Sequence, residues 1–257
     1  MIDHQKTVHE QFDPRAQAYL QSPVHAQGPD LLYAQDLVAQ AMPPSGVALD
    51  VGCGAGHLSF ALAHNLSSVT ALDSSPSMLS TVDRVAAERG LSKIHTVLGD
   101  AAALPFEDGT FCVAATRYSA HHWATPMAAV REMRRVVKPG GYLLVIDVMG
   151  EDDWLVDTHL QTLELLRDRS HVRDYSVAQW RTMMRDAAFT EIGYREWPIR
   201  LHYESWIQRM STPANKAAMI RELQTSAPRE VRKRLAFESD GSFTVRTGLL
   251  WARAKPA

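Results

Sequence analysis

The chain has 257 residues, of which 46% are hydrophobic and 22% are charged, and its formal net charge is −2 at pH 7. This near-neutral balance excludes a global electrostatic attraction to nucleic acid or to an anionic membrane. The N-terminus lacks the apolar segment of a signal peptide and no apolar run approaches a membrane span, so we expect a cytoplasmic protein.

Residues 1–45 are predicted to form one or two helices, because apolar side chains recur at helical spacing between Leu31 and Ala41. From residue 47 to residue 148, short apolar runs alternate with helical patterns. This alternation is typical of a mostly parallel sheet with helices on both faces. The predicted strands are Val47–Val51, Val69–Asp73, Ile94–Leu98, Phe111–Thr116 and Tyr142–Val148, and the predicted helices are Leu58–His64, Ser77–Glu88 and Met127–Val137.

The remainder of the chain is predicted to be mostly helical, with two final strands. Residues 151–235 carry helical patterns that break near Pro213 and Pro228, whereas Ala188–Leu201 and Ser242–Ala254 have the composition of strands. Together these elements predict an α/β protein with a doubly wound, Rossmann-like sheet of seven mostly parallel strands. In such sheets, ligands bind beyond the carboxyl ends of the strands.

Three predicted strands in succession end in glycines or in an acid. The stretch LDVGCGAGH, residues 49–57, places glycine at positions 52, 54 and 56, a spacing that differs from the Gly-x-Gly-x-x-Gly of dinucleotide-binding proteins. A nicotinamide-dependent oxidoreductase is therefore disfavoured. Asp73 ends the second strand, where a carboxylate can accept hydrogen bonds from both ribose hydroxyls, and Asp100 ends the third, near an expected adenine edge. A turn-capping role explains one such acid easily but explains the three strand ends together poorly.

The segment from Val47 to Val148 resembles the class I S-adenosylmethionine-dependent methyltransferases. Its motifs LDVGCGAGH, ALDSSPSML, GDAAALPFEDGTF and VVKPGGYLLVID are similar to those of the branch in ubiquinone and menaquinone biosynthesis, called UbiE-like. RYSAHHW and the opening FDPRAQAYLQSPVHAQG are similar to an uncharacterised bacterial subgroup, often called YafE-like, that has no assigned substrate. The resemblance implies S-adenosylmethionine as cofactor, S-adenosylhomocysteine as product and a small-molecule methyl acceptor. We expect no metal and no nucleic-acid partner.

Carried over by position, the resemblance implies roles for the residues of the first two motifs. Gly52 and Gly54 let the methionine part of the cofactor lie on bare backbone, and Asp50 helps to hold its amino group. Asp73 binds the ribose, and Met78 packs on the adenine. A sulfonium cation suits a pocket that is edged by carboxylates and aromatic faces, which agrees with these roles.

The resemblance also implies roles for residues outside those two motifs. Asp100 and the backbone of Ala101 meet the adenine edge, and Arg117 lies near the methionine part of the cofactor. Tyr19 and His25 belong to an N-terminal lid that closes over the cofactor. For Tyr19, packing within the lid is the alternative to a contact with the cofactor.

The segment Thr116–Trp123, which follows the fourth predicted strand, is where the methyl acceptor is expected. It lacks the Asn/Asp-Pro-Pro-Tyr/Phe tetrapeptide typical of enzymes that methylate adenine or glutamine amino groups. One imidazole of His121 and His122 can take a proton from a phenol, an enol or a ring N–H near neutral pH. His122 is the first candidate because it lies deeper in the turn, and Tyr19 is a further catalytic candidate. The alternative is that the pair of histidines caps the next helix.

These patterns predict two parts of the chain: N-terminal lid helices in residues 1–45, and a class I methyltransferase domain in residues 46–257 with helical insertions at about 151–175 and 203–235. The predicted function is in-line methyl transfer to a small molecule. A phenolic oxygen, a quinone-precursor carbon or oxygen, and a heterocycle nitrogen all stay open as the methylated atom. The alternative is a regulator or pseudo-enzyme that binds S-adenosylmethionine without transferring its methyl group.

Overall fold

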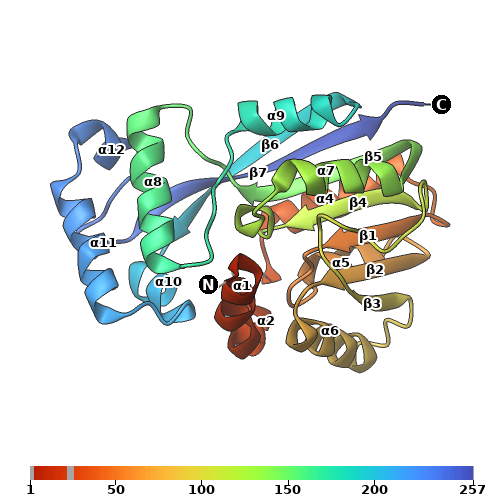
Figure 1. Ribbon diagram of the computed structural model, residues 1–257, viewed down its shortest axis with the longest axis horizontal. Coiled ribbons are helices and arrows are strands. Elements are labelled where there is room, and N and C mark those ends of the chain that lie inside the picture. Colours follow the sequence, from red (N-terminus) through yellow and green to blue (C-terminus); the bar gives the residue numbers. More distant parts are fainter. Residues whose placement is uncertain (1–2, 22–25, 257) are drawn as a thin grey trace.

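The computed structural model describes residues 3–21 and 26–256. Its centre is a seven-stranded sheet in the order β3-β2-β1-β4-β5-β7-β6, in which β7 runs antiparallel to β5 and β6 (Figure 1). The predicted α/β fold with a mostly parallel seven-stranded sheet is therefore confirmed. The strands are β1 (Val47–Val51), β2 (Ser68–Asp73), β3 (Ile94–Leu98), β4 (Phe111–Arg117), β5 (Val137–Val148), β6 (Phe189–Leu201) and β7 (Phe243–Ala254).

Helices cover both faces of the sheet because successive side chains of a buried strand point to opposite sides. In β1, Ala48 packs on one side, with α4 (Pro29–Ala41), α5 (His57–Ala63) and α6 (Pro76–Glu88). Leu49 packs on the other side, with α7 (Pro126–Val136) and α9 (Val177–Asp186). α6 begins one residue before its predicted start at Ser77, since the Ser75 side chain accepts a hydrogen bond from the Met78 N–H and Pro76 is the first helical residue.

The N-terminal region contributes two different parts to the fold. α1 (His4–Phe12), the 3₁₀ turn Asp13–Arg15 and α2 (Ala16–Leu20) lie beside the carboxyl ends of the strands, close to α6 (Figure 1). α4 instead buries Leu31, Ala34 and Val38 in the apolar layer against the sheet. α4 therefore differs from the lid helices predicted for residues 1–45, because its apolar stripe is part of the main core.

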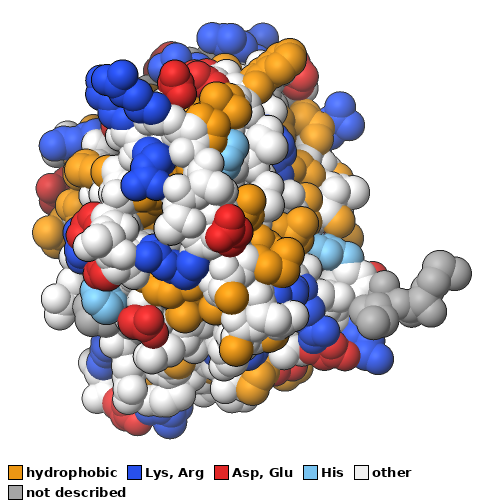
Figure 2. Space-filling model, turned by 90° about the vertical axis from the view of Figure 1, so that its left-hand side faces the viewer, with side chains coloured by type: hydrophobic (Ala, Val, Ile, Leu, Met, Phe, Trp, Pro, Cys, Tyr) orange, Lys and Arg blue, Asp and Glu red, His pale blue; other side chains and the backbone are white. Residues whose placement is uncertain are grey.

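The two segments in which helical insertions were predicted pack together as one cap. The cap consists of α8 (Trp154–Arg167), α10 (Tyr203–Arg209), α11 (Ala214–Ser226) and α12 (Arg229–Arg234). Its helices share an apolar cluster with the distal ends of β6 and β7, including Leu160, Trp206 and Phe243. Figure 2 views the molecule from this side and shows hydrophobic side chains interspersed with charged ones. None of the helices in the described ranges has the length and apolar character needed to span a membrane.

A two-stranded ribbon joins the cap to the sheet. β6 and β7 pair from Phe189 and Ala254 as far as Leu201 and Phe243. β5 pairs with β7 only as far as Val148 and Thr247, so the end of the β6–β7 pair extends beyond it. This extension positions one wall of the candidate site.

Candidate functional site

A cavity of about 340 Å³, here called the main cavity, opens at the carboxyl ends of the strands. This is the place at which doubly wound sheets bind ligands. The structure brings together nearly all the residues predicted for the site, and His25 lies outside the described residues. The predicted residues that line the main cavity are Tyr19, Asp50, Gly52, Gly54, Asp73, Met78, Asp100, Ala101, Arg117 and His122.

The glycine-rich turn after β1 needs glycine for two physical reasons. Gly52, Gly54 and Gly56 have φ values of +68°, +50° and +88°, which side-chain-bearing residues rarely adopt. A Cβ atom on Gly52 would also lie 2.0 Å from Ser119 Oγ. At Gly54 a Cβ atom would meet nothing within 4 Å, so the bare backbone there faces open space. A bulky ligand can therefore lie directly on this turn.

Asp73 supports the glycine-rich turn as well as facing the main cavity. Its Oδ2 accepts a hydrogen bond from the Gly54 N–H at 2.8 Å, and its Oδ1 accepts one from the Ser75 N–H at 2.9 Å. Burial raises the pKa of its carboxyl, while these hydrogen bonds act in the opposite direction. The ribose-binding role predicted for Asp73 is therefore combined with a structural role in the turn.

Asp50 is fully buried at the end of β1. Its Oδ2 accepts a hydrogen bond of 2.6 Å from Ser59 Oγ, whereas its Oδ1 has no hydrogen-bond partner among residues 3–21 and 26–256. Burial raises the pKa of this carboxyl to about 7. A buried oxygen without a partner is costly in isolation and fits a cationic amino group. Together with the open backbone at Gly54, it makes the main cavity a fitting site for S-adenosylmethionine.

Arg117, at the end of β4, forms a buried ion pair that the sequence did not indicate. Its Nε lies 2.5 Å from Asp30 Oδ2 on α4, and its guanidinium group stacks 4.5 Å from the centre of the Tyr118 ring. The ion pair fixes the N-terminal end of α4 next to the main cavity. Arg117 therefore joins the strand end that carries the acceptor segment to the helix that covers the sheet.

α1 and α2 form the roof of the main cavity. Gln5 Nε2 donates to Asp100 Oδ2 at 3.5 Å, and His4 Nε2 donates to the backbone oxygen of His122 at 2.8 Å. Asp100 is exposed, and its Oδ1 caps a turn by accepting from the Ala102 N–H. Tyr19 is buried, which raises its pKa, and its hydroxyl donates to Met210 Sδ on the cap. Tyr19 is therefore a neutral phenol that links the roof to the cap.

A smaller cavity of about 70 Å³, here called the side cavity, lies between the roof, the cap and the β6–β7 ribbon. Residues far apart in the chain form it, and His121 lies on its wall. Because it shares walls with the main cavity, a molecule in it would be next to one in the main cavity. The shared residues are Phe12, Tyr19, Tyr118 and His122.

The two adjacent histidines have opposite electrostatic environments. Burial works against a charge on His121, but the Asp147 carboxylate raises the pKa of His121 to about 9. His121 Nδ1 donates to Asp147 Oδ1 at 2.6 Å. Burial and the charge on His121 hold the pKa of His122 well below its usual range. With ring centres 4.1 Å apart, these pKa shifts favour a single positive charge on the pair at neutral pH, located on His121.

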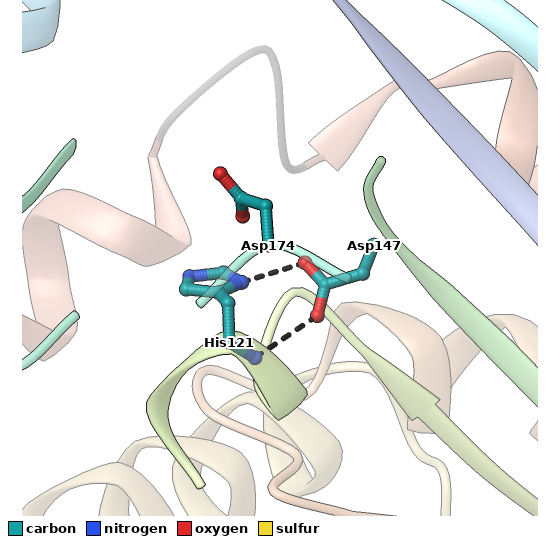
Figure 3. A group of neighbouring side chains, drawn as sticks. All are labelled: His121, Asp147 and Asp174. Atoms are coloured by element: carbon teal, nitrogen blue, oxygen red, sulfur yellow. Dashed lines mark hydrogen bonds and ion pairs between the residues drawn. The ribbon is translucent and has the colours of Figure 1, made fainter. Parts of the chain in front are cut away.

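Figure 3 shows the carboxylates of Asp147 and Asp174 near the imidazole of His121. The candidate ligand atoms of these three residues lie within 4.8 Å of one another, so they are a group that could hold a metal ion. In the structure, however, His121 Nδ1 bonds directly to Asp147, whose Oδ2 also accepts from the His121 backbone N–H at 3.2 Å. The expectation of no metal stays a prediction.

Sequence reasoning missed several residues of the two cavities. Asp147 ends β5, so the rule that selected Asp73 and Asp100 as strand-end acids would also have selected it. Asp174 lies in an irregular segment between α8 and α9, and Ser170 contacts His122 through a backbone oxygen. For these two residues the sequence carries no comparable signal.

Comparisons with known proteins identify the family. Residues 49–145 match the family model of the methyltransferase domain. The chain is 42% identical over 193 residues to the uncharacterised protein YafE of Escherichia coli, in an alignment that covers 75% of this chain and 93% of YafE. It is 35% identical over 103 residues to the demethylmenaquinone methyltransferase of Bacillus subtilis, which covers 39% of this chain and 44% of that enzyme.

The solved structure of YcgJ from Bacillus subtilis superposes with a TM-score of 0.82 at 29% identity and covers 88% of this chain and 100% of that one. In sequence, the chain is 32% identical over 210 residues to YcgJ, an uncharacterised methyltransferase, covering 81% of this chain and 82% of YcgJ. The fold, the motif-bearing cavity and these relatives agree: the chain is a methyltransferase and belongs to the UbiE-like branch of the class I S-adenosylmethionine-dependent family.

Proposed function

We propose that the protein transfers a methyl group from S-adenosylmethionine in the main cavity to a small molecule in the side cavity. The methylated atom is a phenolic oxygen, a quinone-precursor carbon or oxygen, or a heterocycle nitrogen. The observation that carries this proposal is the position of His122 on the wall shared by the two cavities. The presence of a second cavity favours an enzyme over a protein that only binds the cofactor.

The residues at the strand ends hold the cofactor in this proposal. The Asp50 carboxylate receives the amino group, and the backbone of Gly52 and Gly54 supports the methionine part. Asp73 receives the ribose hydroxyls, and Met78, Asp100 and Ala101 surround the adenine. Tyr19 and Arg117 close the site from the roof and from β4. His25 is a further cofactor-binding residue in this proposal.

The hydrogen-bond geometry of His122 supports a role as general base. His122 Nδ1 lies 3.2 Å from the backbone oxygen of Ser170, which can only accept a hydrogen bond. Nδ1 therefore carries the hydrogen in the neutral ring, which leaves the lone pair on Nε2. Because the pKa of His122 is lowered, the ring is neutral at pH 7. It can take the proton of an acceptor O–H or N–H as that atom forms its bond to the methyl group.

The cofactor supplies a methyl group on a good leaving group, so the protein mainly aligns and desolvates the acceptor. His121 is the second candidate and acts through its charge, since Asp147 holds its proton on Nδ1. Tyr19, a neutral phenol on the shared wall, contributes shape and a hydrogen-bonding group rather than a base. Activity in the cytoplasm, without nucleic acid as substrate, completes the proposal.

The proposal is tested by incubating the protein with methyl-labelled S-adenosylmethionine and a small-molecule cell extract. We expect label in a low-molecular-weight product with the wild-type protein and much less with His122→Ala. The partly exposed residue His159 on α8, which is not among the residues that line either cavity, provides the control variant His159→Ala. Label that enters only protein or nucleic acid, or no fraction at all, would contradict the proposal.

A further inference from the structure

Asp174, on the wall of the side cavity, is a buried acid that the fold itself does not use. Only 2% of the residue is exposed, and within the described ranges its Oδ2 has no hydrogen-bond partner. The Gln161 side chain holds the main chain at this point. It accepts a hydrogen bond from the backbone N–H of Asp174 at 3.0 Å and donates one to the backbone oxygen of Asp174 at 2.9 Å. The carboxylate is therefore not needed to hold its own segment in place.

Among the groups that act most strongly on the Asp174 carboxyl, acids outnumber bases. Burial raises the pKa of its carboxyl well above the usual range, and the carboxylates of Glu164, Asp147 and Asp157 raise it further. Two nearby arginines pair with other acids: Arg173 bonds to Asp157 at 2.5 Å, and Arg167 lies 3.2 Å from Glu164. His121 favours the carboxylate, but its proton is held by Asp147. A buried acid in this setting is stabilised by a cation or by a strong hydrogen-bond donor.

Asp174 and His122 lie on different parts of the side cavity. His122 is on the wall shared with the main cavity, whereas Asp174 lines the side cavity and is not among the residues that line the main one. Apolar side chains of β5, the β6–β7 ribbon and the cap form other parts of the wall. These are Val148, Ile199, Leu201, Trp206 and Val245. Glu164, Arg167, Asp168 and Arg209 line the cavity as well, so it combines apolar and charged parts, with Asp174 as a buried acid away from the methyl-transfer position.

We propose that the side cavity binds its acceptor as a cation, with a protonated nitrogen against Asp174 and the atom to be methylated toward His122. This inference deepens the proposed function and rests on it for the identity of the ligand as the acceptor. The acceptor class is an apolar or aromatic body with a basic nitrogen at one end. The cation gives the Asp174 carboxyl a partner and offsets the charge of the surrounding acids.

Three phenols of matched size test the proposal: tyramine, which carries an ammonium group, tyrosol, which carries a hydroxyl group, and 4-hydroxyphenylacetate, which carries a carboxylate. Binding of each is measured by calorimetry to protein saturated with S-adenosylhomocysteine. We expect tyramine to bind about 10- to 100-fold more tightly than 4-hydroxyphenylacetate, with tyrosol between them, because a hydrogen bond to a charged group has a strength of this order.

Asp174→Asn removes the charge and keeps the shape, and we expect the preference for tyramine to fall below about threefold. Asp152→Asn, at an exposed acid before α8, is the matched control and should keep the preference. Asp174→Ser supplies the same comparison if the Asn variant does not fold. Equal binding of the three phenols, no saturable binding of tyramine, or an unchanged preference in both Asp174 variants would overturn the inference.

A divalent metal ion that co-purifies stoichiometrically and is lost in Asp174→Asn would also overturn it, because the carboxylate would then have another partner. The binding measurement involves no methyl transfer, so it separates this inference from the proposed function. If His122→Ala keeps normal turnover, the role of His122 fails while the Asp174-dependent preference still stands. If turnover depends on His122 but the phenols bind equally, the inference fails alone.

Discussion

The main cavity and the side cavity are neighbours, yet they are built in different ways. The main cavity is formed largely by short loops at the ends of adjacent strands, with α1 and α2 above them. The side cavity draws on α1, α2, the turn after β4, the cap and the β6–β7 ribbon, so its residues are spread from Phe12 to Val245. Loops that bind one constant ligand leave a compact sequence motif, whereas a cavity assembled from distant segments does not.

The largest expected effect is on the cofactor side of this comparison. We expect Asp73→Ala to weaken S-adenosylmethionine binding by roughly 2–4 kcal/mol, about 30- to 1000-fold, while the fold survives. The loss combines the ribose contact with the support that Asp73 gives to the Gly54 and Ser75 N–H groups. Calorimetry measures the affinity of Asp73→Ala for S-adenosylmethionine. The control variant is Asp83→Asn, at an exposed acid of α6. Unchanged affinity would remove Asp73 from the cofactor site.

On the shared wall, we expect His122→Ala to lower turnover by about 100-fold while cofactor affinity changes little. The loss should shrink at high pH, because solvent can then deprotonate the acceptor. Since the pKa of His122 is lowered, the neutral form persists as the pH falls through 6.5. Wild-type turnover should therefore stay level from pH 7 to pH 6. Normal turnover of both His121→Ala and His122→Ala across this range would leave alignment and desolvation to carry the reaction.

A smaller effect should appear in the pH dependence of cofactor binding. Burial raises the pKa of Asp50 to about 7, so at lower pH its proton must be lost before it can pair with the amino group of the cofactor. Affinity should therefore rise up to about pH 7 and level off above it, with a loss of about tenfold at pH 6 relative to the plateau. Asp50→Asn should flatten this profile. A wild-type profile without a slope between pH 5.5 and 7 would contradict the assignment.

The smallest expected effect concerns the roof. We expect the amide hydrogens of residues 4–20 to exchange more slowly when S-adenosylhomocysteine is bound. The helices in this range line the main cavity, so a ligand there adds contacts that oppose their local opening. α4 serves as the internal control, since its apolar stripe is buried against the sheet in either state. Hydrogen exchange that is equally slow around Tyr19 with and without the ligand would exclude a closing motion.

Periodicity and turn residues were sufficient to predict most of the sheet. β1 and β3 have the predicted bounds, because short apolar runs end at glycine or aspartate. β5 differs: it was predicted to begin at Tyr142, but the strand already begins at Val137, and Gly140 takes a φ of +75° within it. A register shift between Phe111 and Val113 of the neighbouring strand accommodates this irregular start. Such a bulge depends on the neighbouring strand and cannot be inferred from local sequence.

The candidate site was predictable for residues that lie at or directly after the end of a predicted strand, because the local sequence is enough to place them there. Asp50, Gly54 and Asp73 are found in this way, and all three line the main cavity. The ion pair between Arg117 and Asp30 joins residues that are 87 positions apart, and nothing in either segment indicates the other. A single sequence contains the charges but not their pairing, which arises when α4 packs on the sheet.

The β6–β7 ribbon has a further consequence for the folding units of the protein. The cap has its own apolar cluster and is joined to the sheet through strands that continue beyond the last β5 pairing. Units of this kind can unfold locally at a lower free energy than the whole protein. Local unfolding of the cap would remove Arg167, Trp206 and Arg209 from the side cavity while leaving the glycine-rich turn in place. Under the proposed function, changes of sequence in the cap would therefore alter the acceptor without altering the cofactor, and the cap would act as an exchangeable module.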